Sequence, residues 1–152
     1  MIVLRSLVSI AVLPGIVAAL VPWLVLRGSA LAPFAVFALV PLAAGLALFA
    51  WCVVEFARRG RGTLAPWDAP RRFVASGPYR AVRNPMYVAV ISVLVAEAIA
   101  FGSLRLALYA AFVGLAFHVF VLLYEEPTLE RTFGESYRAY REAVPRWMPR
   151  RP

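Results

Sequence analysis

Two short polar stretches of this sequence carry the side chains most suited to ligand chemistry. The first runs from Gly77 to Tyr87 and gathers two tyrosines, two arginines and an asparagine before a proline. The second is the pair Glu125-Glu126, which directly follows an apolar run. Guanidinium groups bind carboxylates, carboxylates bind cations or hydroxyl groups, and aromatic faces attract cations. The two stretches therefore predict a site for a small charged ligand at the edge of a membrane.

The negative charge of the acidic pair is unusual for its position in the sequence. Its flanking segments are basic and helix C-termini favour cations, so two carboxylates at the expected end of a helix require compensating positive charge. The sequence offers Arg80, Arg83 or a cationic ligand for this role. The structural alternative is that the acids only end a membrane-spanning helix.

Composition places these residues in a membrane protein. The 152 residues are 62% hydrophobic, whereas about half of the residues of a soluble protein are apolar. The net charge of +8 comes from arginine alone. Arginines beside apolar runs are typical of cytoplasmic loops that face anionic lipids, which argues against nucleic-acid binding. Cys52, the only cysteine, lies within an apolar run and is expected to pack there, so neither an intramolecular disulfide nor a cysteine-based metal cluster is expected.

The apolar runs predict an all-α integral membrane bundle of about four transmembrane helices. They cover about residues 6–26, 32–54, 84–101 and 106–124. Runs of this length cross a hydrocarbon core about 30 Å thick. The first run has no polar sequence directly after it, so we interpret it as a retained helix and not as a cleaved signal. Asn84-Pro85 supplies an N-cap and a first-turn proline for the third helix, and Gly102-Ser103 supplies a turn before the fourth.

We expect one domain with four parts. These are an N-terminal helical hairpin (1–56), a cytoplasmic loop (57–83), a second helical hairpin (84–124) and a cytoplasmic tail (125–152). Four crossings place both termini and the loop on one side, and the arginines of the loop and tail make that side cytoplasmic. We expect a multi-pass protein of the cell inner membrane, and residues 62–68 to form a lid over the site.

The tail is polar and amphipathic. Its apolar positions Leu129, Phe133, Tyr137 and Tyr140 recur at helical spacing, which predicts one helix or two short helices around Gly134. This stripe is expected to pack on the membrane surface or on the cytoplasmic mouth of the bundle. Residues 144–149 are expected to end the regular structure and to place Trp147 near the lipid headgroups.

Two isolated polar residues lie within the apolar runs. His118 is about two helical turns before the acidic pair and is either a packed residue or a polar group lining a cavity; a metal site is not expected, because no second histidine exists. Glu97 lies toward the far leaflet. It is either functional, as intramembrane acids often are, or paired with Arg105 across the hairpin turn.

The motifs in this order resemble those of a known family. Arg83-Asn84-Pro85-Met86-Tyr87 resembles the Arg-His-Pro-x-Tyr motif of isoprenylcysteine carboxyl methyltransferases and related membrane phospholipid methyltransferases. Glu125-Glu126-Pro127-Thr128-Leu129 matches their Glu-Glu-x-x-Leu motif, and residues 133–140 and 144–146 are similar to their C-terminal signature. The similarity covers about residues 60–150.

This resemblance implies an integral membrane methyltransferase that uses S-adenosylmethionine without a Rossmann fold and takes a lipophilic acceptor from the bilayer. We expect Arg83 and Glu126 to be catalytic. The cofactor's carboxylate suits an arginine, its cationic and hydroxyl groups suit the glutamates, and its adenine or sulfonium suits a tyrosine ring. The residues expected to bind the cofactor are Tyr79, Arg80, Arg83, Asn84, Pro85, Tyr87, His118, Glu125, Glu126 and Leu129.

Two positions depart from the family pattern. Asn84 stands where the family often has histidine, and its amide cannot shuttle a proton at neutral pH. A required base would be Glu126, His118 or the substrate itself. Ala89 stands where many members have glycine, so a ligand or another backbone can approach this position slightly less closely. The acceptor therefore stays open between a prenylcysteine carboxylate and a phospholipid amine, and a non-catalytic membrane sensor or assembly protein is the alternative of a different class.

Overall fold

The computed structural model describes residues 14–56, 58 and 74–149, and every regular element among them is helical, which confirms the all-α class for that part of the chain. In chain order the elements are η1 (Ile16–Leu20), α2 (Val21–Val25), η2 (Ala35–Ala38), α3 (Leu39–Glu55), η4 (Gly77–Arg80), α4 (Pro85–Phe101), α5 (Leu104–Phe120), η5 (Val121–Glu125), α6 (Glu126–Phe133) and α7 (Glu135–Ala143). The elements η1 and η5 are π-helical, and η2 and η4 are 3₁₀ turns.

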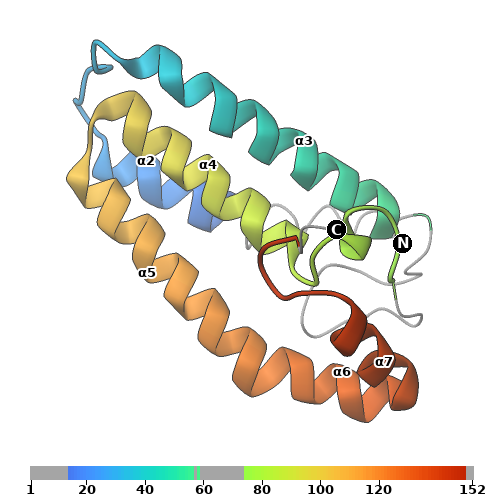
Figure 1. Cartoon of the computed structure of the whole chain (residues 1–152). Helices are drawn as coiled ribbons and strands as arrows, with labels where there is room; N and C mark the ends of the chain where they lie inside the picture. Colours follow the sequence, from blue (N-terminus) through green and yellow to red (C-terminus); the bar gives the residue numbers. More distant parts are fainter. Residues whose placement is uncertain (1–13, 57, 59–73, 150–152) are drawn as a thin grey trace.

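Helix α4 is the central element of the bundle (Figure 1). It packs along α3 and along α5, and η1 also contacts it. In the core between α4 and α5, Val90 and Leu94 meet Ala110 and Val113, and Phe49 of α3 packs against this cluster. The helix that begins at the candidate site is therefore held on several sides.

The packing of α3 on α4 depends on Gly45. A Cβ atom at this position would lie 2.9 Å from the carbonyl oxygen of Ala89, so the small residue permits the close approach of the two backbones. Ser92 on α4 also donates a hydrogen bond of 2.8 Å to the carbonyl oxygen of Pro41 on α3. Helix α3 packs chiefly on α4, whereas α2 contacts α5.

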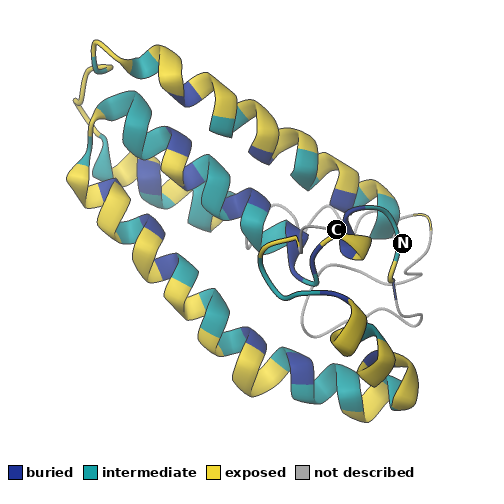
Figure 2. Cartoon of the chain, in the orientation of Figure 1, coloured by how far each residue is buried: buried dark blue, intermediate teal, exposed yellow. Residues whose placement is uncertain are grey.

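Two helical stretches are long and apolar enough to cross a membrane. They are Ala35–Glu55 and Leu104–Phe133, each with a mean hydropathy of 2.3. Only 17% and 22% of their most apolar windows are buried, and their outer faces are largely exposed (Figure 2). Water-soluble proteins rarely expose such continuous apolar surface. The first stretch overlaps the second predicted span (32–54), and the other contains the fourth (106–124).

The other two predicted spans correspond to shorter apolar helices, Ile16–Val25 and Pro85–Phe101. Helix α4 starts and ends where the sequence predicted, and its 17 residues cover about 25 Å, close to the lower limit for crossing a hydrocarbon core. The first 13 residues lie outside the described part, so the predicted first span is observed only in its second half. The turn between α4 and α5 is confirmed: Gly102 has a φ of +56°, and Ser103 Oγ caps α5 by accepting from the backbone N–H of Leu106 at 3.3 Å.

The predicted end of the fourth helix near Tyr124 is wrong. The chain stays helical to Phe133, because η5 joins α5 to α6 without a break. Pro127 lacks the N–H that an α-helix would use, and the π turn just before it accommodates this loss: the Glu126 N–H donates to Val121 O, five residues back. The acidic pair therefore lies inside a long helix and not at its C-terminus, so the helix-dipole argument for compensating charge does not apply.

The tail forms two short helices, as the spacing of its apolar residues predicted. Gly134 separates α6 from α7 with a φ of +55°, a conformation that favours glycine. Tyr137 is buried, and Tyr140 donates a hydrogen bond of 2.6 Å to the carbonyl oxygen of Tyr79. The stripe therefore packs onto the end of the bundle where α4 begins, and residues 144–149 are not helical, as predicted.

Candidate active site

Three segments meet at one end of the bundle. They are the start of α4, the junction of η5 with α6, and the non-helical residues 144–147 after α7, here called the C-terminal strap (Figure 1). The backbone N–H of Arg83 donates to Pro145 O at 2.8 Å, and Asn84 Nδ2 donates to Arg146 O at 3.3 Å. These two bonds dock the strap on the residues that precede α4.

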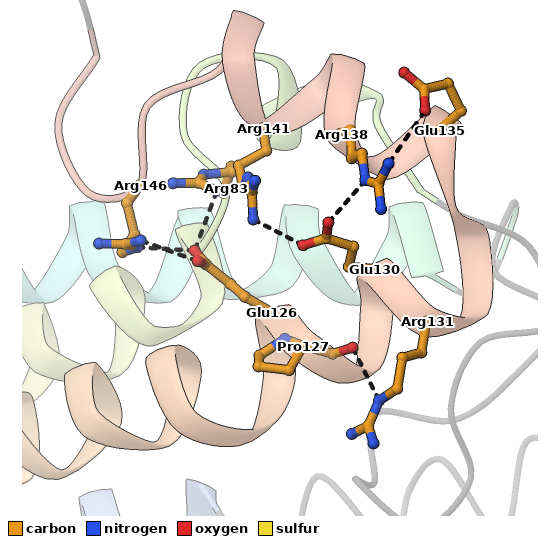
Figure 3. A network of polar contacts seen from close by, with 9 residues as sticks. All are labelled: Arg83, Glu126, Pro127, Glu130, Arg131, Glu135, Arg138, Arg141 and Arg146. Carbon is orange, nitrogen blue, oxygen red and sulfur yellow. Dashed lines mark hydrogen bonds and ion pairs between the residues drawn. The ribbon is translucent and has the colours of Figure 1, made fainter.

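Glu126 is the centre of a buried ion cluster (Figure 3). Arg146 binds it with two parallel hydrogen bonds, from Nε to Oε1 at 2.8 Å and from Nη2 to Oε2 at 2.9 Å. Arg83 Nη1 lies 3.1 Å from Oε1, and the side chains of Arg83 and Glu126 are each only 9% exposed. The expected neutralisation of the acidic pair by Arg83 is confirmed for Glu126. Arg80 is exposed and forms no ion pair with the described residues.

The cluster carries two guanidinium groups for one carboxylate. The hydrogen bonds from Arg146 to Glu126 raise the pKa of the Arg146 guanidinium, so this group stays charged. Within the described residues, the buried Nε of Arg83 has no hydrogen-bond acceptor. Beside the cluster, burial raises the pKa of Tyr137 to about 12, and the Glu126 carboxylate acts in the same direction, so this phenol is neutral. The cluster therefore keeps a surplus positive charge and a buried donor that is not used.

Glu125 has a different environment from that of Glu126. Tyr87 on α4 donates its hydroxyl to Glu125 Oε2 at 2.7 Å. The Tyr87 ring packs on Phe117, with ring centres 4.6 Å apart, and lies 6.5 Å from the ring of Trp147. The adjacent glutamates thus bind different partners: Glu126 binds arginines, and Glu125 binds a tyrosine in an aromatic environment.

His118 and Trp147 form a further polar contact of this region. Trp147 Nε1 donates a hydrogen bond of 3.0 Å to His118 Nδ1. The indole therefore lies against α5, half-buried, at the mouth of the bundle.

The start of α4 differs from prediction in one respect. Asn84 occupies the N-cap position and Pro85 the first helical position, as expected, but the Asn84 side chain makes no capping hydrogen bond. It is buried and donates to the strap instead, because the Arg146 carbonyl lies within its reach.

The other predicted ligands lie farther from the cluster. Tyr79 is buried against Phe56 and Cys52, burial raises its pKa well above its usual range, and Arg80 next to it points to the exterior. The preceding Ser76 hydrogen-bonds Glu55 at 2.7 Å, which ties this segment to α3. Leu129 is half-buried on α6.

Two residues of the site were not predicted as ligands, Arg146 and Trp147. Arg146 ends the segment 144–146 that resembles the family's C-terminal signature, and Trp147 follows it directly. The position of Arg146 in that segment is the signal that could have identified it as a partner of Glu126. Most of the predicted loop 57–83, including the predicted lid at 62–68, lies outside the described residues.

Glu97 does not contribute to this site. It lies 12 residues after Pro85 on α4, about 18 Å along the helix axis. The alternative pairing with Arg105 is wrong: no such ion pair forms, and among the described residues Glu97 Oε2 is buried without a hydrogen-bond partner.

Comparison with known proteins identifies the family. The sequence model described as phospholipid methyltransferase matches residues 23–136, from the first described helices to the start of α7. No curated protein matches the chain. The matched region contains Arg83 and both glutamates, and this family is grouped with the isoprenylcysteine carboxyl methyltransferases, so the resemblance stated from the motifs is confirmed. The chain belongs to the phospholipid methyltransferase family, whose membership implies S-adenosylmethionine-dependent methylation of a phospholipid or other lipophilic acceptor.

Proposed function

We propose that this chain is a four-span membrane enzyme that transfers a methyl group from S-adenosylmethionine to a lipid or lipid-linked acceptor at the cytoplasmic face. The observation that carries the proposal is the buried cluster of Glu126 with Arg83 and Arg146, next to the Tyr87–Glu125 pair. Residues 1–56 and 84–124 supply the spans, and residues 57–83 and 125–152 face the cytoplasm, as the positive-inside rule favours for arginine-rich segments.

The residues present fit the cofactor. The surplus positive charge and the unused Nε donor of Arg83 suit a carboxylate, which guanidinium groups bind strongly. Glu125, bound only by the neutral Tyr87 hydroxyl among the described residues, suits an ammonium or ribose hydroxyl groups. The Tyr87 and Trp147 rings suit a sulfonium through a cation–π contact worth about 0.5–2 kcal/mol. When bound, the cofactor supplies an electrophilic methyl group on sulfur.

The protein's own contribution is positioning. In this proposal Glu126 holds the two arginines in place, and Arg83 orients the ligand. Asn84 and Pro85 fix the start of α4, and the strap closes the site on the polar side. Alignment of the reacting groups and exclusion of water are the main sources of catalysis for such a displacement.

A route for a lipophilic acceptor is supported by an apolar groove between α4 and α5. The groove has a volume of about 590 Å³ and runs from Ile91 and Gly114 to Phe34 and Gly102. Its near end is one helical turn from Tyr87 and Phe117. A hydrocarbon chain on this face would bring its head group toward Glu125.

Family membership favours a phospholipid amine over a prenylcysteine carboxylate as the acceptor. An amine must lose a proton, and the Asn84 amide cannot take it. In the described part of the chain, Glu125 is a carboxylate of the candidate site that no arginine neutralises. We therefore assign Glu125 as the base that takes the proton of an amine acceptor. A carboxylate acceptor needs no base.

The test uses full-length protein in lipid nanodiscs. Calorimetry should detect S-adenosylmethionine binding, and a methyl-labelled cofactor should pass its label to a lipid that chromatography then identifies. Glu126→Gln should abolish both signals, while Glu130→Gln on the same helix serves as the matched control. Absence of binding in every lipid would refute the enzyme proposal, and binding without transfer would favour the non-catalytic sensor.

A further inference from the structure

The hydrogen bond between Trp147 and His118 constrains the chemistry of the histidine. An indole N–H can only donate, so His118 Nδ1, which accepts at 3.0 Å, carries no proton. One ring nitrogen of His118 is thus already bound by the protein itself. We therefore consider a role of His118 through Trp147 and not as a direct ligand of the cofactor.

Trp147 links His118 to the acidic pair. Its ring centre lies 5.9 Å from that of His118 and 6.5 Å from that of Tyr87, distances at which aromatic rings attract one another. Tyr87 in turn packs on Phe117 and donates its hydroxyl to Glu125. A continuous series of contacts therefore runs from the imidazole through the indole and the phenol to the Glu125 carboxylate.

The hydrogen bond to His118 fixes the indole on the side of the ring that faces α5. The strap's backbone is docked through Pro145 and Arg146, but Met148, directly after Trp147, is exposed. On the side of the indole that faces α5, the His118 bond is the polar contact that holds the ring. Without it, the half-buried ring is free to move toward lipid or water.

We propose that His118 and Trp147 form a latch that positions Tyr87 and Glu125 for ligand binding. The proposal rests on the proposed function, because it takes the Glu125 region as the place where S-adenosylmethionine binds. His118 is a positioning residue and acts through the indole. A purely structural tie would change the stability of the protein but not its affinity for the cofactor, which separates the two roles.

Three variants test the latch. His118→Leu removes the acceptor, His118→Asn retains an acceptor oxygen close to the position of Nδ1, and Trp147→Phe retains an aromatic ring without the N–H donor. Calorimetry with S-adenosylmethionine should show a Kd raised about threefold to tenfold in His118→Leu and in Trp147→Phe, as expected for one hydrogen bond. His118→Asn should bind like the native protein, and the double variant His118→Leu/Trp147→Phe should lose no more than either single one.

A second measurement needs no cofactor. In a background where Trp23, Trp51 and Trp67 are replaced by phenylalanine, Trp147 is the only tryptophan that fluoresces. Acrylamide should quench its emission more strongly after His118→Leu and to the native extent after His118→Asn. Gel filtration of each variant checks that the fold is retained.

The outcomes separate the latch from the proposed function. If the native protein binds no S-adenosylmethionine, the proposed function fails, while the quenching experiment still decides whether the latch exists. If quenching and affinity are unchanged in His118→Leu, the latch is refuted. It is equally refuted if His118→Asn is as impaired as His118→Leu, because the acceptor atom would then not be the feature that matters.

Discussion

Two glutamates on α6, one helical turn apart, each bind two arginines, but they have different structural roles. Glu126 is buried and joins Arg83 before α4 to Arg146 in the strap, so it connects three segments distant in sequence. Glu130 is 27% exposed and binds Arg138 and Arg141, both on α7, which are 55% and 42% exposed (Figure 3). The donor–acceptor distances are about equal, 2.8 Å for the best contact of each.

The difference shows that burial, not the number of ion pairs, decides how much such a cluster contributes to stability. Exposed pairs are screened by water and salt and contribute little to stability. A buried charge, in contrast, is strongly destabilising once its partner is removed, because it is left without compensation. Glu126 therefore determines the local fold and the candidate site, whereas Glu130 only adjusts the packing of α7 on α6.

The largest expected effect follows from Glu126→Ala. It leaves the buried guanidinium of Arg83 without its carboxylate, which should destabilise the protein by about 3–5 kcal/mol. Cofactor binding should be lost. Thermal unfolding in detergent and calorimetry measure the two effects. Native stability in this variant would contradict the assignment of Glu126 as the centre of the site.

Arg146→Lys tests the geometry of the cluster. Lysine keeps the charge but cannot form the two parallel bonds to Glu126, so we expect a loss of about 1.5–3 kcal/mol and weaker cofactor binding. Arg141→Lys makes the same change at Glu130 and is the matched control. Equal shifts of the unfolding midpoint in the two variants would remove the distinction between the clusters.

Tyr87→Phe asks whether Glu125, which binds no arginine, belongs to the same site. Loss of the hydroxyl removes the 2.7 Å bond but keeps the ring against Phe117. We expect roughly tenfold weaker cofactor binding with little change in the unfolding midpoint, since one hydrogen bond within the site is lost. Unchanged binding would exclude Glu125 from the ligand contacts.

The smallest effect is expected for Glu130→Gln. The exposed pairs with Arg138 and Arg141 are lost, but water replaces them, so the unfolding midpoint should stay within experimental error and cofactor binding should not change. Repeating the unfolding at low and high salt sharpens the result. A large loss of stability at high salt would show that this cluster contributes more to stability than surface ion pairs do.

The sequence predicted the parts of the fold that depend on local pattern. The start of α4 at Asn84-Pro85, the turn at Gly102 and the break at Gly134 all follow from residues with strong local preferences. Arg83 was one of three candidates for neutralising the acidic pair, with Arg80 and a cationic ligand, and the structure pairs it with Glu126.

The parts that depend on long-range contacts were not predictable in the same way. The Asn84 side chain fails to cap α4 because a carbonyl of the distant strap competes for it. Arg146 reaches Glu126 only after α7 reverses the chain, and the bond between Trp147 and His118 depends on the same return. No local spacing encodes these contacts. The site residues themselves remain predictions until binding is measured.

The π turn η5 sets a constraint on length. Each residue of a helix turns it by about 100°, and the turn at Val121–Glu125 contains one residue more than an α-helix would use. Loss of a single residue there would rotate α6 by about that angle and move Glu126 away from Arg83. The exposed Leu122 and Leu123 can vary in type, since they face outward, but their number is fixed. In this stretch, natural variants should accumulate substitutions and avoid deletions.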